Sequence, residues 1–206
     1  MTTDPERMAD HWWWRPGWKP GTRFLTFHLT FQSNPEVHRL AADYRHALAS
    51  VDGLDLIPDA WLHLTTQGLG FVEELAAEEV EAIVEAAGER MARIPAFELT
   101  LDRPEITPEA IRWEAAPSAP PAAVRRALRG AIASVWDTVP EAEDGFAPHV
   151  SIAYSNSTGP AAPVRAALDS VRSQPAVAYI RSVDLIELNR DHQMYQWETR
   201  AQLPLG

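Results

Sequence analysis

The 206-residue sequence predicts an α+β fold of two similar lobes, related by a pseudo-twofold axis, with a cleft between them. Alternating apolar and polar residues predict half-buried strands, and apolar residues at three- and four-residue spacing predict amphipathic helices. The order helix, strand, helix, strand, strand occurs twice along the chain. Both copies carry a His-x-Thr or His-x-Ser tripeptide in the corresponding strand, at His63 and at His149. Two matching halves that each present such a strand favour a shared cleft.

The first elements follow from short local patterns. Residues 24–32 alternate between a large apolar face and a polar face, which predicts a half-buried strand. Asn34 and Pro35 are typical of a helix start, and apolar spacing continues the helix to about residue 50. A loop over 51–59 leads into a strand over 61–67, which carries the first tripeptide of the repeat.

The following elements complete the first copy of this order and then repeat it. An acidic helix is expected over about 73–90, followed by strands in "FELTLDR" and "IRWEA". A helix beginning at Pro120 and reaching Trp136 precedes the strand of His149, and a helix over about 161–173 precedes strands near 179–189 and 194–203. We therefore expect an irregular Trp- and Pro-rich segment over 1–22 and one domain over 23–206. Its lobes would be roughly 36–116 and 117–206, exchanging strands.

The composition excludes several classes of protein. The 18 Lys and Arg residues are outnumbered by 29 Asp and Glu, giving a formal net charge of -11, so no basic path for long nucleic acid is expected. No apolar run approaches the roughly 20 residues of a membrane span. The chain has no cysteine, which excludes disulfides, thiol catalysis and thiolate metal sites. The first residues do not read as a secretory signal, and a cytoplasmic monomer is the expectation.

The tripeptides supply the parts of an acid–base site. Residues i and i+2 of a strand point to the same side, so His63 would lie beside Thr65 and His149 beside Ser151. An imidazole can accept or release a proton at neutral pH, and a hydroxyl can donate to a phosphoryl oxygen. Two such pairs facing each other suffice for in-line cleavage of a phosphodiester without a metal or other cofactor.

Two stretches carrying these tripeptides, "WLHLTTQGLGF" and "FAPHVSIAYS", resemble the paired signatures of the 2H phosphoesterases. That superfamily includes 2′-5′ RNA ligases and RNA 2′,3′-cyclic phosphodiesterases. The resemblance implies antiparallel sheets lining a central cleft, with helices outside and no metal. It also implies catalysis by His63 and His149, with Thr65 and Ser151 holding the phosphate. The expected substrate is a nucleotide or RNA end with a cyclic phosphate or a 2′-5′ phosphodiester.

The sequence departs from the family pattern in three places. Thr66 stands where an apolar residue is common, and Ser151 replaces the usual threonine of the second motif. Many members carry a basic residue after the second tripeptide, where this chain reads Ile-Ala-Tyr-Ser. Tyr154 has the parity of the apolar face and is expected to be a core residue. The missing cation leaves the identity of the substrate open.

The other candidate residues lie outside the two tripeptides of the repeat. His28 belongs to a third tripeptide, in the strand outside the repeat, so it is the spare histidine. It could line the pocket or be an ordinary histidine. The tryptophans around Trp13 could cover a lobe or stack on a base, since stacking contributes about 1–3 kcal/mol per base. We expect Trp13, Arg190 and Tyr195 to contact one base and its ribose.

Two alternatives to a phosphoesterase remain. One is a binding module that keeps the cleft but has no turnover, and catalysis with any 2′,3′-cyclic nucleotide would exclude it. The other is a metalloenzyme using His28, His63 and His149. This second interpretation is disfavoured because no carboxylate accompanies the tripeptides within their strands, and activity that survives strong chelators would exclude it.

Overall fold

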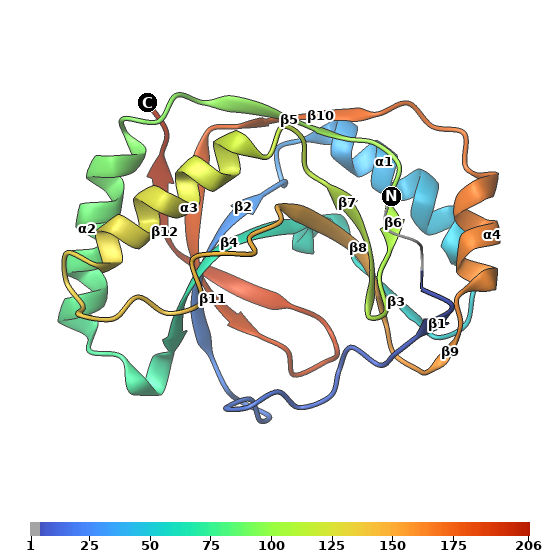
Figure 1. The fold of residues 1–206 in the computed structure, drawn as a ribbon, viewed down its shortest axis with the longest axis horizontal. Helices are drawn as coiled ribbons and strands as arrows, with labels where there is room; N and C mark the ends of the chain where they lie inside the picture. The colour runs from blue at the N-terminus through green and yellow to red at the C-terminus, as the bar shows by residue number, and fades with distance from the viewer. Residues whose placement is uncertain (1–4) are drawn as a thin grey trace.

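The computed structural model describes residues 5–206 and contains two four-stranded antiparallel sheets (Figure 1). The first sheet has the order β12–β11–β2–β4, with β2 at Phe24–Thr30, β4 at His63–Phe71, β11 at Ser182–Asn189 and β12 at Gln196–Pro204. The second has the order β3–β8–β7–β6, with β3 at Leu54–Leu56, β6 at Glu105–Ile106, β7 at Ala110–Glu114 and β8 at His149–Ser155. The predicted α+β class is confirmed.

The helices form two pairs at opposite ends of the molecule (Figure 1). Helices α2 (Ala77–Met91) and α3 (Ala119–Ile132) pack together and contact β12 and β4 of the first sheet. Helices α1 (Pro35–Leu48) and α4 (Ala162–Ser170) pack together, and α1 contacts β3 and β8 of the second sheet. Each lobe therefore contains elements from both halves of the sequence, because a helix of the first half packs on a helix of the second half in both lobes.

Smaller elements connect these layers. Strands β5 (Phe97–Leu101) and β10 (Ala176–Ile180) pair with each other, and β1 (Arg7–Met8) pairs with β9 (Gly159–Pro160). Two short 3₁₀ helices, Asp59–Trp61 and Val72–Glu74, flank β4. None of the helices within residues 5–206 has the length and apolar character needed to cross a membrane.

Strand β2 lies at the centre of the first sheet and differs in one respect from its prediction. Its apolar face is buried as expected, with Phe27 and Leu29 fully covered. Its polar face is also buried, so that Thr26 is 2% exposed and His28 is 1% exposed. The reason is that the rings of His63 and Trp197 pack against His28 from other strands of the sheet.

The segment before β2 crosses the open side of the two sheets (Figure 1, bottom). At one end, His11 donates its backbone N–H to the carbonyl of Ser155, and Trp12 donates from its indole nitrogen to Asp55 at 2.7 Å. At the other end, Gly21 and Arg23 donate to the carboxylate of Asp191. The segment is thus attached to both lobes.

Candidate active site

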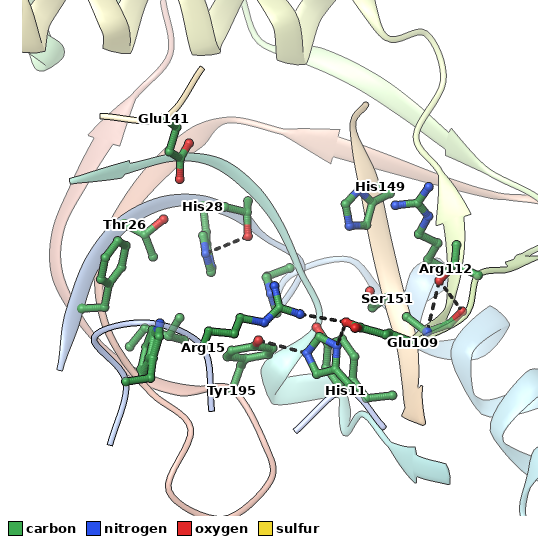
Figure 2. A pocket seen from close by; sticks show the side chains of 18 residues that line it. His11, Arg15, Thr26, His28, Glu109, Arg112, Glu141, His149, Ser151 and Tyr195 are labelled. Carbon is green, nitrogen blue, oxygen red and sulfur yellow. Dashed lines mark hydrogen bonds and ion pairs between the residues drawn. The ribbon is translucent and has the colours of Figure 1, made fainter. Parts of the chain in front are cut away.

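A cleft of about 500 Å³ lies between the two sheets (Figure 2). Residues of β2 and β4 in the first sheet and of β7 and β8 in the second line this cleft. The N-terminal segment and Tyr195, just before β12, line it as well. The histidine and the hydroxyl residue of each repeated tripeptide line it, namely His63, Thr65, His149 and Ser151. Side chains that are distant in the sequence therefore face one space.

The first tripeptide begins β4. Leu62 and Leu64 are fully buried, and this anchors the strand with His63 and Thr65 on the opposite side, facing the cleft. The Nδ1 atom of His63 lies 2.8 Å from the carbonyl oxygen of Trp61. Because a carbonyl oxygen can only accept, Nδ1–H is the donor, and in the neutral ring Nε2 carries the free lone pair. This nitrogen is the proton acceptor that an acid–base reaction needs.

A β-bulge explains the first departure from the family pattern. Phe27 pairs with Gln67 and His28 with Thr65, so Thr66 is an extra residue in β4. Thr66 is fully buried, and its hydroxyl donates to the Phe27 carbonyl at 2.7 Å. A hydroxyl is useful at this position because it bonds to a backbone carbonyl within the bulge.

The second tripeptide has the same geometry at the start of β8. Val150 and Ile152 are fully buried, and His149 and Ser151 line the cleft. His149 donates from Nδ1 to the carbonyl oxygen of Ala147 at 2.8 Å. Each imidazole is therefore fixed by the carbonyl two residues before it, and each keeps the same tautomer.

Both imidazoles have a lowered pKa in the free protein, which favours their neutral form at neutral pH. The pKa of His63 is lowered to about 4, chiefly by burial; the hydrogen bond to the Trp61 carbonyl opposes this shift, and the neighbouring His149 adds to it. Burial is also the largest cause of the lowered pKa of His149, and the guanidinium of Arg112 adds to it. At neutral pH, a negative charge in the cleft would favour the return of a proton to one ring. A bound phosphate would do this, because an anion favours the charged imidazolium.

Two arginines from other elements line the cleft, whereas the second motif itself has no basic residue. Arg112 of β7 stands opposite Ser151 of β8 and shares its face, and its guanidinium lies beside His149 in Figure 2. Arg15 of the N-terminal segment also lines the cleft, where it donates to Glu109 at 2.8 Å. The alternating pattern of "IRWEA" indicates that Arg112 points away from the core. The pairing of β7 with β8 is what shows that this direction leads into the cleft.

A family model described as the 2′-5′ RNA ligase superfamily matches residues 31–192. The chain belongs to this superfamily. Membership supports a phosphoesterase- or ligase-type function and confirms the predicted resemblance to the 2H phosphoesterases. No curated protein matches in a sequence comparison.

Solved structures of this superfamily's fold cover nearly the whole chain. TT0787 of Thermus thermophilus has a TM-score of 0.67 at 19% identity, covering 88% of this chain and 97% of its own. E. coli LigT complexed with 3′-AMP has a TM-score of 0.66 at 18% identity, covering 89% of this chain and 98% of its own. ATU0111 from Agrobacterium tumefaciens is more distant, with a TM-score of 0.52 at 16% identity over 86% of this chain and 84% of its own. At these identities the likeness concerns the fold.

In this member of the 2′-5′ RNA ligase superfamily, His28 lies directly behind the first tripeptide. Its ring is stacked on that of His63, with centroids 4.5 Å apart and planes inclined by 5°. Its Nε2 atom lies 3.1 Å from the hydroxyl oxygen of Thr65. Burial, together with the neighbouring His63, holds the pKa of His28 well below its ordinary value of 6.5. The spare histidine is thus one of the residues that line the cleft, and its Nε2 atom contacts the Thr65 hydroxyl.

The segment preceding the matched range closes one side of the cleft. His11, Arg15 and Trp18 line it, and the Nε2 atom of His11 lies 2.9 Å from the hydroxyl of Tyr195. The His11 ring also stacks on Tyr154 at 4.2 Å. Tyr154 is 5% exposed and belongs to the core, as expected, and it also borders the cleft.

The three residues expected to contact a base lie in different surroundings. Tyr195 lines the cleft. Trp13 is 50% exposed outside the lining, and its indole nitrogen donates to the cleft residue Glu109 at 3.2 Å. Arg190 is 3% exposed and donates to the carbonyls of His11 and Trp13. Its guanidinium also lies 5.3–5.8 Å from the ring centroids of Trp12, Trp14, Trp18 and Tyr195.

Among residues 5–206, no group of three or more His, Asp or Glu side chains is arranged to hold a metal ion. The independence from metals expected from the sequence remains a prediction for experiment.

Proposed function

We propose that this protein is a metal-independent phosphoesterase. It would open a 2′,3′-cyclic phosphate, or cleave or form a 2′-5′ phosphodiester, on a nucleotide or RNA end. The observation that supports this most directly is the pair of imidazoles in one cleft. Each is fixed through Nδ1 and keeps Nε2 for proton transfer. Two positioned proton-transfer groups with hydroxyls beside them match the needs of in-line displacement at phosphorus.

In the hydrolytic direction, one imidazole accepts a proton from water as the water oxygen bonds to phosphorus. The bond from phosphorus to the ribose 2′ or 3′ oxygen breaks, and the second imidazole, protonated beforehand, gives its proton to that oxygen. Thr65 and Ser151 donate to the non-bridging oxygens, and Arg112 balances their charge. Ligation would use the same steps with a 5′-hydroxyl group in place of water: one imidazole accepts the hydroxyl proton as its oxygen bonds to phosphorus, and the other gives its proton to the ribose 3′ oxygen that leaves. Cleavage of the 2′-5′ phosphodiester back to the cyclic phosphate would run these steps in reverse and exchange the roles of the two histidines.

The proposed ligand is small. The N-terminal segment and Tyr195 wall one side of the cleft, and the net charge of -11 disfavours a long phosphate track. LigT has been crystallised with 3′-AMP, with ATP and with NADP+, so nucleotides are the class we propose here too. We propose that Trp13 and Tyr195 meet the base or ribose, and that the buried Arg190 acts on the ligand through the aromatic rings it holds.

The test is the opening of 2′,3′-cyclic AMP, followed by chromatography of the monophosphate product. His63→Ala and His149→Ala should each lower the rate by about 10²–10⁴-fold, because either loss removes one proton-transfer group. The double variant should be little worse than either single one, since both serve one mechanism. His46→Ala, on the polar side of α1 away from the cleft, is the control and should keep full activity.

Three results would overturn the proposal. Absence of turnover with every 2′,3′-cyclic nucleotide, despite binding, would indicate a binding module without catalysis. Loss of activity on treatment with a strong chelator, restored by a divalent metal, would contradict the metal-independent mechanism. A fully active His63→Ala or His149→Ala variant would show that the paired histidines are not the catalytic groups.

A further inference from the structure

His28 has an unusual position for a histidine at an acid–base site. It lies in the middle of β2, between Asp184 of β11 and Thr65 of β4. Its ring is 1% exposed, enclosed by the parallel ring of His63 and the edge-on ring of Trp197. Its Nε2 atom is engaged with Thr65 at 3.1 Å. His28 borders the cleft, but it is almost fully covered, and its Nε2 atom is held by Thr65, whose side chain is the exposed one of the pair.

The lowered pKa of His28 favours a neutral ring at neutral pH, and a neutral ring has one N–H donor and one acceptor nitrogen. Its Nδ1 atom is buried without a hydrogen-bond partner among the described residues. If the proton were on Nδ1, a buried N–H would have no acceptor. Orphaned buried N–H groups are rarer in proteins than under-satisfied acceptors. The tautomer with the proton on Nε2 avoids this cost and donates to the Thr65 oxygen.

The choice of tautomer decides what Thr65 can offer a ligand. A threonine hydroxyl that accepts from His28 keeps its own proton free, and this proton can point into the cleft. A hydroxyl that donates to His28 instead presents only lone pairs to the cleft, and these repel a phosphate oxygen. An anion in the cleft therefore favours the Nε2–H tautomer of His28 as well.

We propose that His28 is a positioning residue for phosphate. It donates from Nε2 to the Thr65 oxygen and so directs the Thr65 hydroxyl proton toward the bound phosphoryl group. The stacked ring also fixes the plane of the catalytic His63. This inference rests on the proposed function, because it assigns Thr65 the role of phosphate donor. The histidine of the third tripeptide then has a role that differs from substrate contact and from proton transfer, because it acts through Thr65.

The test uses substitutions that separate the donor from the ring. His28→Phe keeps an aromatic ring against His63 but has no N–H, and His28→Gln places an amide N–H near the position of Nε2. With 2′,3′-cyclic AMP, His28→Phe should lower kcat/KM by about 10- to 100-fold, the effect of losing a hydrogen bond to a charged group. His28→Gln should recover to within about threefold of the parent, since its amide restores the donor to Thr65. Adding Thr65→Val to His28→Phe should cause little further loss.

The control is His38→Phe. His38 contacts the backbone carbonyl of Phe31 through Nε2 at 2.8 Å, but it lies on α1 away from the cleft, so its loss should leave kcat/KM unchanged. Thermal unfolding establishes that each variant is folded. The proposal fails if folded His28→Phe matches the parent, if folded His28→Gln is no better than His28→Phe, or if the losses from His28→Phe and Thr65→Val multiply.

A second measurement needs neither a variant nor turnover. Long-range ¹H–¹⁵N correlation spectra of the parent protein report which ring nitrogen of His28 carries the proton. With saturating inorganic phosphate, we expect the proton on Nε2 and a bare Nδ1, and the opposite tautomer would refute the inference. Because phosphate binding requires no catalysis, this experiment tests His28 even if the protein opens no cyclic phosphate. A protein that binds phosphate but opens no cyclic phosphate would contradict only the proposed function.

Discussion

Lowering the pH should destabilise this protein steeply at a mildly acidic pH, because three buried histidines resist protonation. Burial is the main cause of the lowered pKa at each of them. It brings the pKa of His11 to about 3 and that of His63 to about 4, and it holds the pKa of His28 well below 6.5. In the unfolded chain, each ring has its ordinary pKa of about 6.5. At mildly acidic pH the unfolded chain therefore binds more protons than the folded protein does.

The sign and size follow from proton linkage. A lowered folded-state pKa contributes stability above pH 6.5 that is lost as the pH falls toward the folded value. At pH 5.5 each ring is about 0.9 protonated in the unfolded chain, whereas His11 and His63, with folded pKa values of about 3 and about 4, are almost unprotonated in the folded protein. These two rings account for about 1.8 protons, and His28 adds to the difference in the same direction. At about 1.36 kcal/mol per proton and pH unit, unfolding should become easier by at least about 2–3 kcal/mol from pH 6 to pH 5. This is a large share of a typical domain's total stability.

The assay is urea unfolding followed by tryptophan fluorescence at pH 7, 6, 5.5 and 5. The slope of the unfolding free energy against pH gives the difference in bound protons directly. His11→Gln and His63→Gln should each reduce that slope by about one proton, whatever their effect on stability at pH 7. A slope below about one proton between pH 6 and 5 would refute the reasoning, since it would mean that these rings are solvated or already charged in the folded protein.

Other predictions concern the cleft. Thr65→Val and Ser151→Ala should each weaken the binding of inorganic phosphate about tenfold in calorimetry, through loss of a hydrogen bond to a charged group, and unchanged affinity would contradict their role. The free enzyme's catalytic histidines have lowered pKa values, so kcat/KM should trace a bell with its optimum below pH 6.5. A rate that rises steadily to pH 9 would instead indicate hydroxide chemistry. Arg190→Lys should raise KM for 2′,3′-cyclic AMP about tenfold with little change in kcat, because lysine cannot replace a guanidinium among four aromatic rings; an unchanged KM would show that the N-terminal segment stays in place without it. A short oligonucleotide with a cyclic end should bind as tightly as a long RNA, with a salt slope of about one to two, and a large gain with length would reveal a basic path.

Local sequence information was sufficient for the strands of the two motifs and for their orientation. Leu62 and Leu64 on one side, and Val150 and Ile152 on the other, are buried as alternation predicts. Because the side-chain period of a strand is two, burying these residues forces the histidine and hydroxyl of each tripeptide to face away from the core. The repeat of the motif indicated two such faces, and the structure brings all four side chains into one cleft.

What surrounds those four side chains depended on contacts between distant parts of the chain. Arg112 faces Ser151 because β7 pairs with β8, and His28 meets Thr65 because β2 pairs with β4 around a bulge at Thr66. The loss of charge on His28 likewise follows from its enclosure by rings of β4 and β12.

The sequence alone thus determined the two repeated tripeptides and the α+β class, because periodicity and residue chemistry are properties of neighbouring residues. The tertiary structure alone decided which arginines line the cleft, what surrounds the spare histidine and where the N-terminal segment crosses the cleft. The physical reason is that strand register and burial depend on which surfaces meet after folding, and no local pattern in a single sequence specifies that partner.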